Sequence, residues 1–405
     1  MTPNTISWAA IENPKVKGAK PEKTEMHTAY WQSEAHNPPP KRVQVIDDTL
    51  SADAAYKLAC EGNAMLWSGD FQNAKHLMQA ISRRIDNRFT KPKAVKAASQ
   101  AERSNESGPQ AQFHLHRKNQ IERARTLGML LVELSADYAL PYNRAPDVKA
   151  ACESAYGVIK NGVEKKAIVV SLRELLGLIG AYEWRKNGVE IEALNAKITP
   201  YYGVYSPLRG EYINLVATAP IAASVKTAFD IGTGTGVLAA LLAKRGVASV
   251  IATDTNPRAI KCATENINTL GFTKTVKIVE ADLYPEVGRA DLIVCNPPWI
   301  PASANSPIDH AIYDPNSQML KGFLNGLKEH LNPKGEGWLI MSDIAEHLGL
   351  RTREDLLAMF EAAGLSLIEK LDIKPTHAKT QDKTDALYAA RAKEVTSLYR
   401  LTATV

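Results

Sequence analysis

The sequence is poor in cysteine and contains no long apolar run. Its 405 residues include only four cysteines, and no two of them stand at the C-x-x-C spacing of zinc or redox centres: Cys60, Cys152, Cys262 and Cys295. No run reaches the roughly eighteen apolar residues of a membrane-spanning helix. The polar, proline-containing N-terminus also lacks the apolar core of a secretory signal. We therefore expect a cytoplasmic protein without a metal site or a membrane association.

Charge is unevenly distributed along the chain. The formal net charge is +5, but residues 71–126 contain twelve Lys and Arg against four acidic residues, a local excess of +8. Such a basic block can dock RNA or an acidic protein surface, or it can be a solvated helix face followed by a basic loop. The overall balance, 45% apolar and 23% charged residues, is that of a globular protein long enough for two domains.

The N-terminal half is predicted to be mainly helical. Residues 1–45 are polar and end near three consecutive prolines, so a disordered tail is expected. Apolar residues then recur at three- and four-residue spacing, which predicts helices at Ala52–Cys60, Asp70–Arg84, from Phe113 to Leu134, Val148–Tyr156 and Ser171–Lys186. Residues 97–112 have almost no large apolar side chains and predict a flexible loop. Residues 46–195 are therefore predicted to form a mainly α-helical domain that recognises the substrate.

The pattern changes near residue 198. The aromatic, proline-broken segment 198–207 suits a hairpin or a connector between domains. After it, strand and helix patterns alternate, which predicts a parallel sheet covered by helices on both faces. The expected strands are Thr227–Ile231, Ser249–Thr253, Val276–Glu280, Asp291–Cys295 and Gly337–Met341, and the expected helices are Val237–Arg245, Pro257–Leu270 and Glu354–Ala363. Strands at 365–371 and 395–401 are expected to pair antiparallel at the sheet edge. Residues 196–405 thus form one predicted α/β domain.

A glycine-rich turn lies between the first strand and the first helix of this domain. Asp230 precedes Gly232, Gly234 and Gly236, which lack a Cβ and so let the backbone bend sharply and approach a ligand. The dinucleotide fingerprint G-x-G-x-x-G needs a glycine where this chain has Val237. The spacing therefore favours a cofactor that has no pyrophosphate and whose cationic end lies along the turn.

Two acidic residues end the next two strands. Asp254 stands 18 residues after the last glycine of the turn, where a carboxylate can accept both ribose hydroxyls. Asp282 ends the third strand, where it can reach an adenine amino group. Either aspartate alone could be a helix N-cap. Three acids at three consecutive strand ends instead predict a ligand site, because open α/β sheets bind ligands at that edge.

The fourth strand runs into Asn296, Pro297, Pro298 and Trp299. This turn suits an acceptor with a planar NH2 group, such as an amide or an aromatic amine. Such a group is a poor nucleophile, because its lone pair is delocalised. The Asn296 side-chain oxygen and the Pro297 carbonyl can accept its two hydrogens and aim the lone pair at a methyl group. The prolines stiffen the turn, and Trp299 offers a flat face on which an amide or a base can stack. Holding the nitrogen in line with the methyl carbon would then supply much of the rate enhancement of methyl transfer.

These motifs resemble those of the class I S-adenosylmethionine-dependent methyltransferases, and among them the glutamine-N5 protein methyltransferases of release factors and ribosomal proteins. The segments Tyr205–Val216 and Tyr313–Leu327 resemble the family's segments before and after the Asn-Pro-Pro turn. The resemblance covers residues 198–345. It implies a Rossmann-like seven-stranded sheet, S-adenosyl-L-methionine as cofactor, and catalytic roles for Asn296, Pro297, Pro298 and Trp299. The implied cofactor contacts are Asp230, Gly232, Thr233, Gly234, Thr235, Gly236, Asp254, Asp282, Leu283 and Asn296.

The sequence departs from the family pattern in two places. The aromatic residue of the clamp is Trp299, where the family has Tyr or Phe. Leu208 and Gly210 interrupt the family's Pro-Arg-x-Glu order, which leaves Arg209 and Glu211 as candidate lid residues or as a surface ion pair.

The sequence leaves the methyl acceptor open. One alternative is glutamine N5 of a protein that acts in translation. The other is an exocyclic amine, of the adenine N6 type, in RNA or DNA, and such a base would have to be unpaired or flipped. The sequence HLHRK at residues 114–118 favours RNA if those side chains form one face. A scaffold that binds the cofactor without turnover and a nicotinamide dehydrogenase are weaker alternatives. Nothing in the sequence indicates the oligomeric state.

Overall fold

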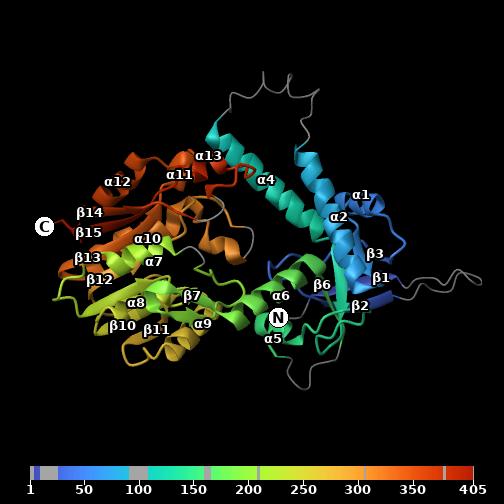
Figure 1. Ribbon diagram of the computed structural model, residues 1–405, viewed down its shortest axis with the longest axis horizontal. Helices are drawn as coiled ribbons and strands as arrows, with labels where there is room; N and C mark the ends of the chain where they lie inside the picture. Colours follow the sequence, from blue (N-terminus) through green and yellow to red (C-terminus); the bar gives the residue numbers. More distant parts are fainter. Residues whose placement is uncertain are drawn as a thin grey trace, which may run out of the picture. The chain divides into compact units, whose positions relative to one another are not determined.

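The computed structural model describes residues 4–9, 26–90, 108–158, 166–207, 210–304, 307–376 and 380–404 (Figure 1). By their internal contacts the residues divide into two compact units. The N-terminal unit comprises Met1–Asn105 and Arg117–Tyr182, and the C-terminal unit comprises Glu106–His116 and Glu183–Val405. The division after Tyr182 falls before the predicted boundary at residue 196. The short segment Glu106–His116 belongs to the C-terminal unit, which the sequence did not indicate.

The C-terminal unit is built on a seven-stranded sheet in the order β11-β10-β9-β12-β13-β15-β14. The strands are β9 (Thr227–Ile231), β10 (Ser249–Asp254), β11 (Val276–Glu280), β12 (Ala290–Cys295), β13 (Leu331–Ser342), β14 (Leu365–Ile373) and β15 (Thr396–Ala403). Strands β9 to β13 pair in parallel, whereas β15 pairs antiparallel with β13 and with β14. The predicted α/β class, the seven strands and the antiparallel edge pair are confirmed.

Helices cover both faces of this sheet, because its strands alternate apolar side chains between the two faces. On β12, Leu292 and Val294 belong to one buried cluster, and Ile293 and Cys295 belong to another. The first cluster includes residues of α7 (Glu211–Thr218), α8 (Val237–Lys244) and α9 (Pro257–Thr269), and the second includes residues of α10 (Gln318–His330) and α12 (Arg353–Ala362). The sequence-based prediction contained neither α7 nor α10.

Several short elements complete the C-terminal unit. A two-stranded sheet formed by β7 (Val189–Ile191) and β8 (Ala196–Ile198) precedes the segment for which a hairpin or connector was predicted. The other short elements are the helices α11 (Ile344–His347) and α13 (Tyr388–Arg391) and the 3-10 turns Glu192–Leu194, Pro307–Ala311 and Pro315–Ser317. Within the described part of the chain, no helix combines the length and apolar character needed to cross a membrane.

The N-terminal unit contains a six-stranded sheet in the order β1-β2-β6-β5-β4-β3. Its strands are β1 (Thr5–Ala9), β2 (Met26–Trp31), β3 (Val43–Ile46), β4 (Ala64–Trp67), β5 (Leu130–Leu134) and β6 (Ile168–Ser171). The longer helices that lie wholly or partly in this unit are α1 (Ala52–Cys60), α2 (Phe71–Thr90), α4 (Pro109–Leu127), α5 (Lys149–Tyr156) and α6 (Leu172–Asn187). The unit is therefore α/β, because the predicted helices are accompanied by a six-stranded sheet that the prediction of a mainly helical domain did not contain.

The error comes from short buried strands. Leu130–Leu134 was expected to continue the helix that begins near Phe113, but it forms β5, where Leu130, Leu131 and Val132 are fully buried. An apolar run of four or five residues fits a buried helix and a buried strand equally well. The predicted helix Ala52–Cys60 is confirmed to the residue, and those at 148–156 and 171–186 are confirmed to within one residue at each end.

The expected disorder of residues 1–45 is contradicted where the structure describes them. Strands β1 and β2 pair antiparallel from Thr5 with Tyr30 to Ala9 with Met26. Ile6 and Trp8 point into a small buried cluster that also contains Ala29, so the alternation of buried and exposed side chains, not the polar average, determines this segment. Residues 10–25 lie outside the described part. Of the predicted loop 97–112, residues 97–107 also lie outside it, and residues 109–112 begin α4.

Candidate functional site

Three neighbouring strands bring the predicted motifs to one edge of the C-terminal sheet. Ile231 of β9 pairs with Cys295 of β12 on one side and with Thr253 of β10 on the other. The residues that directly follow these three are Gly232, Asn296 and Asp254. The glycine turn and the Asn-Pro-Pro-Trp turn therefore lie side by side on the carboxyl edge, where open α/β sheets bind ligands.

The glycine turn has a backbone that favours glycine at three positions. Gly232, Gly234 and Gly236 have φ angles of +70°, +56° and +81°. A Cβ on Gly236 would lie 3.3 Å from the Cα of Ala263, so this glycine lets α8 pack closely on α9. A Cβ on Gly232 would lie 2.5 Å from the Cε of Met319, whereas nothing lies within 4 Å of one on Gly234. The turn therefore presents bare backbone and open space at its middle glycine.

Asp230 holds the turn from within. Its Oδ2 accepts a hydrogen bond of 2.6 Å from the Thr233 hydroxyl and one of 3.0 Å from the backbone N–H of Ala239. The Asp230 side chain is 1% exposed, and Thr233 and Thr235 are also buried. Burial raises the pKa of the Asp230 carboxyl to about 6, against the lowering effect of both hydrogen bonds. These three side chains shape the turn, and their predicted contact with a cofactor stays a prediction.

Asp254 joins the end of β10 to the glycine turn. Its Oδ2 accepts a hydrogen bond of 3.0 Å from the backbone N–H of Gly234, and its Oδ1 accepts one of 2.9 Å from that of Asn256. A carboxylate offers about four acceptor positions, so two are free for the hydroxyls of a ligand. The side chain is half-buried, which leaves it accessible from the rim.

Asp282 and Leu283 follow β11 on the same rim. The Asp282 side chain is exposed. Leu283 has a φ of +64°, and its carbonyl oxygen accepts a hydrogen bond from the Thr253 hydroxyl. Its side chain packs where a Cβ on Gly322 of α10 would lie. The hydrogen bond fixes this left-handed turn against β10, and the predicted cofactor contacts of both residues remain predictions.

The Asn-Pro-Pro-Trp turn is partly accessible. Pro297 is buried, whereas Asn296, Pro298 and Trp299 are half-buried. The indole Nε1–H of Trp299 donates a hydrogen bond of 2.9 Å to Oδ1 of Asn296. The turn is also held from behind, because Nη2 of Arg351 donates to the Trp299 carbonyl at 3.4 Å. The Asn296 side-chain oxygen, which is expected to bind an NH2 group, is thus itself held by Trp299.

A cluster of apolar residues beside this turn was not predicted. Phe113, in the segment of α4 that belongs to the C-terminal unit, is 1% exposed. It forms a buried cluster with residues of α11, α13 and their flanks, against which Trp299, Ile300 and Tyr313 pack. The ring centroids of Phe113 and Tyr313 are 6.5 Å apart. No local pattern identifies Phe113, because it lies almost 190 residues before the turn it supports.

The candidate lid residues have different outcomes. Glu211 is buried at the start of α7, and its Oε1 accepts a hydrogen bond of 3.1 Å from the backbone N–H of Thr376. Glu211 therefore ties the segment after β14 to the segment before the glycine turn. Arg209, with Leu208, lies outside the described residues.

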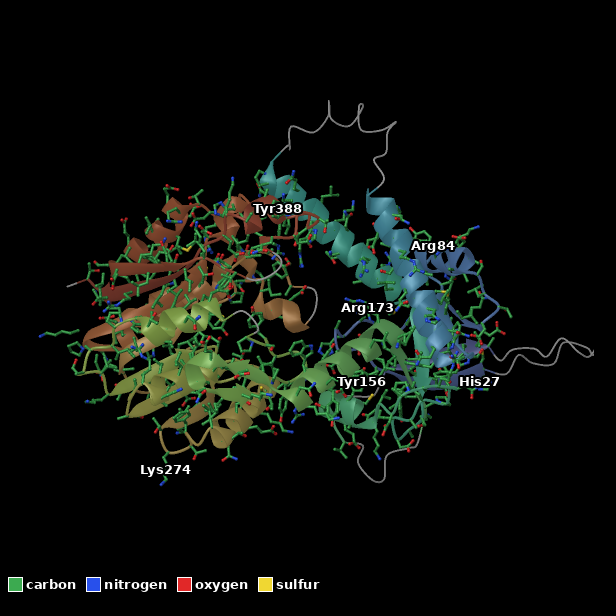
Figure 2. The ribbon with its side chains drawn as sticks, viewed as in Figure 1. His27, Arg84, Tyr156, Arg173, Lys274 and Tyr388 are labelled. Atoms are coloured by element: carbon green, nitrogen blue, oxygen red, sulfur yellow. The ribbon has the colours of Figure 1, made fainter. Side chains whose placement is uncertain are left out.

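Part of the basic block is neutralised within the N-terminal unit. Arg84 of α2, labelled in Figure 2, lies 2.6 Å from a carboxylate oxygen of Asp53. Arg88 pairs with Glu122 at 2.9 Å, and Arg123 pairs with Asp86 at 3.0 Å. These pairs agree with a solvated helix face. The basic residues at 91, 93, 96 and 103 lie outside the described part of the chain.

Comparison with known proteins bears on the same part of the chain. The family model of the methyltransferase small domain matches residues 214–363, which include the glycine turn and the Asn-Pro-Pro-Trp turn. A Bacteroides fragilis protein named tRNA1(Val) (adenine(37)-N6)-methyltransferase is 31% identical over 160 residues, which are 36% of this chain and 67% of that protein. The chain belongs to the methyltransferases. The residues that match the family model lie wholly in the C-terminal unit of this methyltransferase.

Other relatives of the methyltransferase carry glutamine-N5 names. A protein of Methanocaldococcus jannaschii named putative protein N5-glutamine methyltransferase is 33% identical over 122 residues, which are 30% of this chain and 59% of that protein. The release factor glutamine methyltransferase of Cereibacter sphaeroides is 32% identical over 166 residues, 38% of this chain and 57% of that protein. The chain thus spans somewhat more than half the length of these two relatives.

Proposed function

We propose that this protein transfers a methyl group from S-adenosyl-L-methionine to the side-chain nitrogen of a glutamine in a protein substrate that acts in translation. The observation that carries the proposal is the register of β9 and β12, which sets Gly232 beside Asn296 on one rim. A cofactor along the glycine turn would therefore meet an acceptor held by the neighbouring turn.

The residues of the rim fit this cofactor. Gly234 leaves open the space that a Cβ would fill, which lets a ligand approach the backbone. Asp254 keeps two acceptor positions for ribose hydroxyls after its bonds to Gly234 and Asn256. The exposed Asp282 stands at the next strand end, where its carboxylate can accept from an adenine amino group.

The chemistry needs orientation more than acid–base assistance. When bound, the cofactor supplies an electrophilic methyl group carried on a sulfonium, and the sulfur departs as a neutral thioether once its bond to the methyl group breaks. Asn296 Oδ1 and the Pro297 carbonyl accept the two N–H hydrogens of the acceptor, so its lone pair points along the rim toward the glycine turn. The nitrogen acidifies as its bond to carbon forms, and its proton then passes to water. Fixing the two reactants in line removes most of the entropic part of the barrier.

The acceptor is assigned from the names of the relatives. Those of Methanocaldococcus jannaschii and Cereibacter sphaeroides refer to glutamine, and the segment Tyr313–Leu327 resembles that family. Adenine N6 of RNA is the second candidate, because the Bacteroides fragilis relative named for adenine N6 shares 67% of its length with this chain. Both acceptors are planar NH2 groups, so the same clamp serves either.

Methyl transfer into a cell lysate separates the candidates. The purified full-length chain and tritiated S-adenosylmethionine are added to lysate, and the product is then treated with protease or with nuclease. We expect the label to become soluble on protease treatment, and acid hydrolysis of the labelled protein to release methylamine. Label released by nuclease instead would show that the acceptor is a base and not a glutamine. If the protein binds the cofactor but labels no fraction, it is a scaffold without methyltransferase activity.

Salt dependence gives a second, independent test. Binding to nucleic acid weakens steeply with salt, because each phosphate contact releases counterions. We expect a mobility shift with total RNA to be weak and to disappear at about 200 mM salt, without a matching loss of methyl transfer to the protein fraction. A transfer rate that falls as steeply as RNA binding would favour the nucleic-acid acceptor.

A further inference from the structure

The indole of Trp299 defines the orientation of the Asn296 side chain. An indole Nε1–H is a donor and has no acceptor position, so the atom of Asn296 that faces it at 2.9 Å is the carboxamide oxygen. The amide nitrogen therefore points the other way. Of the two acceptor positions on that oxygen, one is taken by Trp299 and one remains for an N–H of the methyl acceptor.

The packing of Trp299 supports a fixed indole. Its ring packs against all three apolar clusters that meet at this rim: the one beneath α7 to α9, the one beneath α10 and α12, and the one around Phe113. Arg351 holds the backbone carbonyl of the same residue. An indole wedged between three clusters keeps its N–H direction, which a side chain lying free over a pocket would not.

We propose that Trp299 is a positioning residue that acts through Asn296. Its N–H fixes the clamp oxygen before the acceptor arrives, so that little reorganisation is left for the reaction. The sequence alone suggests a different role for Trp299, as a flat face on which the acceptor stacks. A Phe at this position has no donor, which makes the hydrogen bond a specific consequence of tryptophan. This inference rests on the proposed methyl transfer to an NH2 group.

The two roles of Trp299 predict different results for the variant Trp299→Phe. Phe keeps an aromatic face but loses the N–H. If Trp299 positions Asn296, kcat falls roughly tenfold, the loss of about one hydrogen bond in the transition state. The KM for the labelled protein fraction and the Kd for S-adenosylmethionine then change less than about threefold. A plate for the acceptor would instead be retained by Phe, with kcat near that of the wild type.

A double-mutant cycle with Asn296→Ala decides whether the effect passes through Asn296. Residues that act as one unit are not additive. We therefore expect Trp299→Phe to have less than a twofold effect on kcat in the Asn296→Ala background. Additive losses would overturn the proposal, because Trp299 would then act on the acceptor or the fold independently of Asn296.

Trp67→Phe is the matched structural control. It makes the same substitution in the N-terminal unit, where the buried Trp67 indole donates a hydrogen bond of 3.0 Å to the Asp70 carbonyl, and it touches neither Trp299 nor Asn296. We expect it to lower the melting temperature at least as much as Trp299→Phe while leaving kcat within about twofold of the wild type. An equal loss of kcat in both variants would show a packing effect and overturn the proposal. A wild-type protein that labels no protein or RNA would instead contradict the proposed function, which the variants do not test.

Discussion

The carboxylate of Asp254 accepts a hydrogen bond of 3.0 Å from the backbone N–H of Gly234. One residue thus has two tasks in the proposed site. It orders the middle of the glycine turn, and it offers its free acceptor positions to a ribose. Substitution of Asp254 can distinguish the two tasks, because only the contact with the ribose involves the cofactor directly.

Asp254→Ala is expected to weaken binding of S-adenosylmethionine by roughly 10- to 100-fold. The loss corresponds to about 1–3 kcal/mol, the contribution of charge-assisted hydrogen bonds to the ribose. Isothermal titration calorimetry measures it directly. The matched variant is Asp254→Asn, whose amide oxygen can still accept from Gly234 but carries no charge, and an intermediate affinity is expected. An unchanged affinity in folded Asp254→Ala would remove Asp254 from the cofactor site.

Asn296→Ala is expected to reduce turnover by roughly 100-fold while changing the affinity for the cofactor less than about threefold. Its oxygen is proposed to orient the acceptor in the transition state, and the loss of one such polar contact has effects of this size. Single-turnover rates with the protein fraction that accepts the label measure the loss of turnover, and calorimetry measures the affinity for the cofactor. A wild-type rate would exclude the clamp from the mechanism.

Gly232→Ala is expected to lower both the stability and the cofactor affinity. A φ of +70° costs a side chain about 1–2 kcal/mol, and the new Cβ would lie 2.5 Å from the Cε of Met319. Gly246→Ala is the control, because its φ is +93° and nothing lies within 4 Å of a Cβ there. Chemical denaturation should show a similar loss of stability in both variants, because both carry the cost of a positive φ and the Met319 methyl, at the end of a flexible side chain, can move aside. Only Gly232→Ala should lose affinity for the cofactor, and an equal loss of affinity in Gly246→Ala would contradict the place of Gly232 in the cofactor site.

The C-terminal sheet could be predicted because most of its strands are bounded by strong local signals, although β13 begins at Leu331, six residues before the predicted Gly337. Strands β9 and β11 have the predicted limits, and α9 begins at the predicted Pro257. Asn256 caps that helix by accepting from the backbone N–H of Arg258 at 2.9 Å. The parallel strands β9, β10 and β12 end at or directly before Gly232, Asp254 and Asn296. Because the carboxyl ends of parallel strands meet at one edge of the sheet, topology alone brought the predicted motifs together.

Two features of the site could not be predicted for different physical reasons. The place of Phe113 depends on contacts with residues more than 180 positions away, and no local pattern encodes such contacts. The bond between Trp299 and Asn296 joins residues three positions apart, but its direction depends on rotamers that the clusters around the indole select. In the N-terminal unit, strands such as β5 are too short for their period to be read.

The buried carboxyl of Asp230 predicts a pH dependence of stability. Burial raises its pKa from 3.8 to about 6 in the folded state. The native protein therefore holds a proton that the unfolded chain has released between these values, so its contribution to the free energy of unfolding falls as the pH rises from about 4 to about 6. It is fully present below the unfolded pKa and constant above pH 6. A shift of about two pKa units corresponds to at most ~3 kcal/mol.

Comparing wild type with Asp230→Asn isolates this contribution, because the amide does not titrate and the other carboxylates are common to both proteins. The difference in the free energy of unfolding, variant minus wild type, should rise between pH 4 and 6 and then stay level. Urea denaturation at a series of pH values measures it. Only the change with pH is diagnostic, since the amide also alters the bonds to Thr233 and Ala239. A difference that is constant across this range would mean that Asp230 is ionised in the folded protein down to its ordinary pKa, and that the glycine turn is held by a charge.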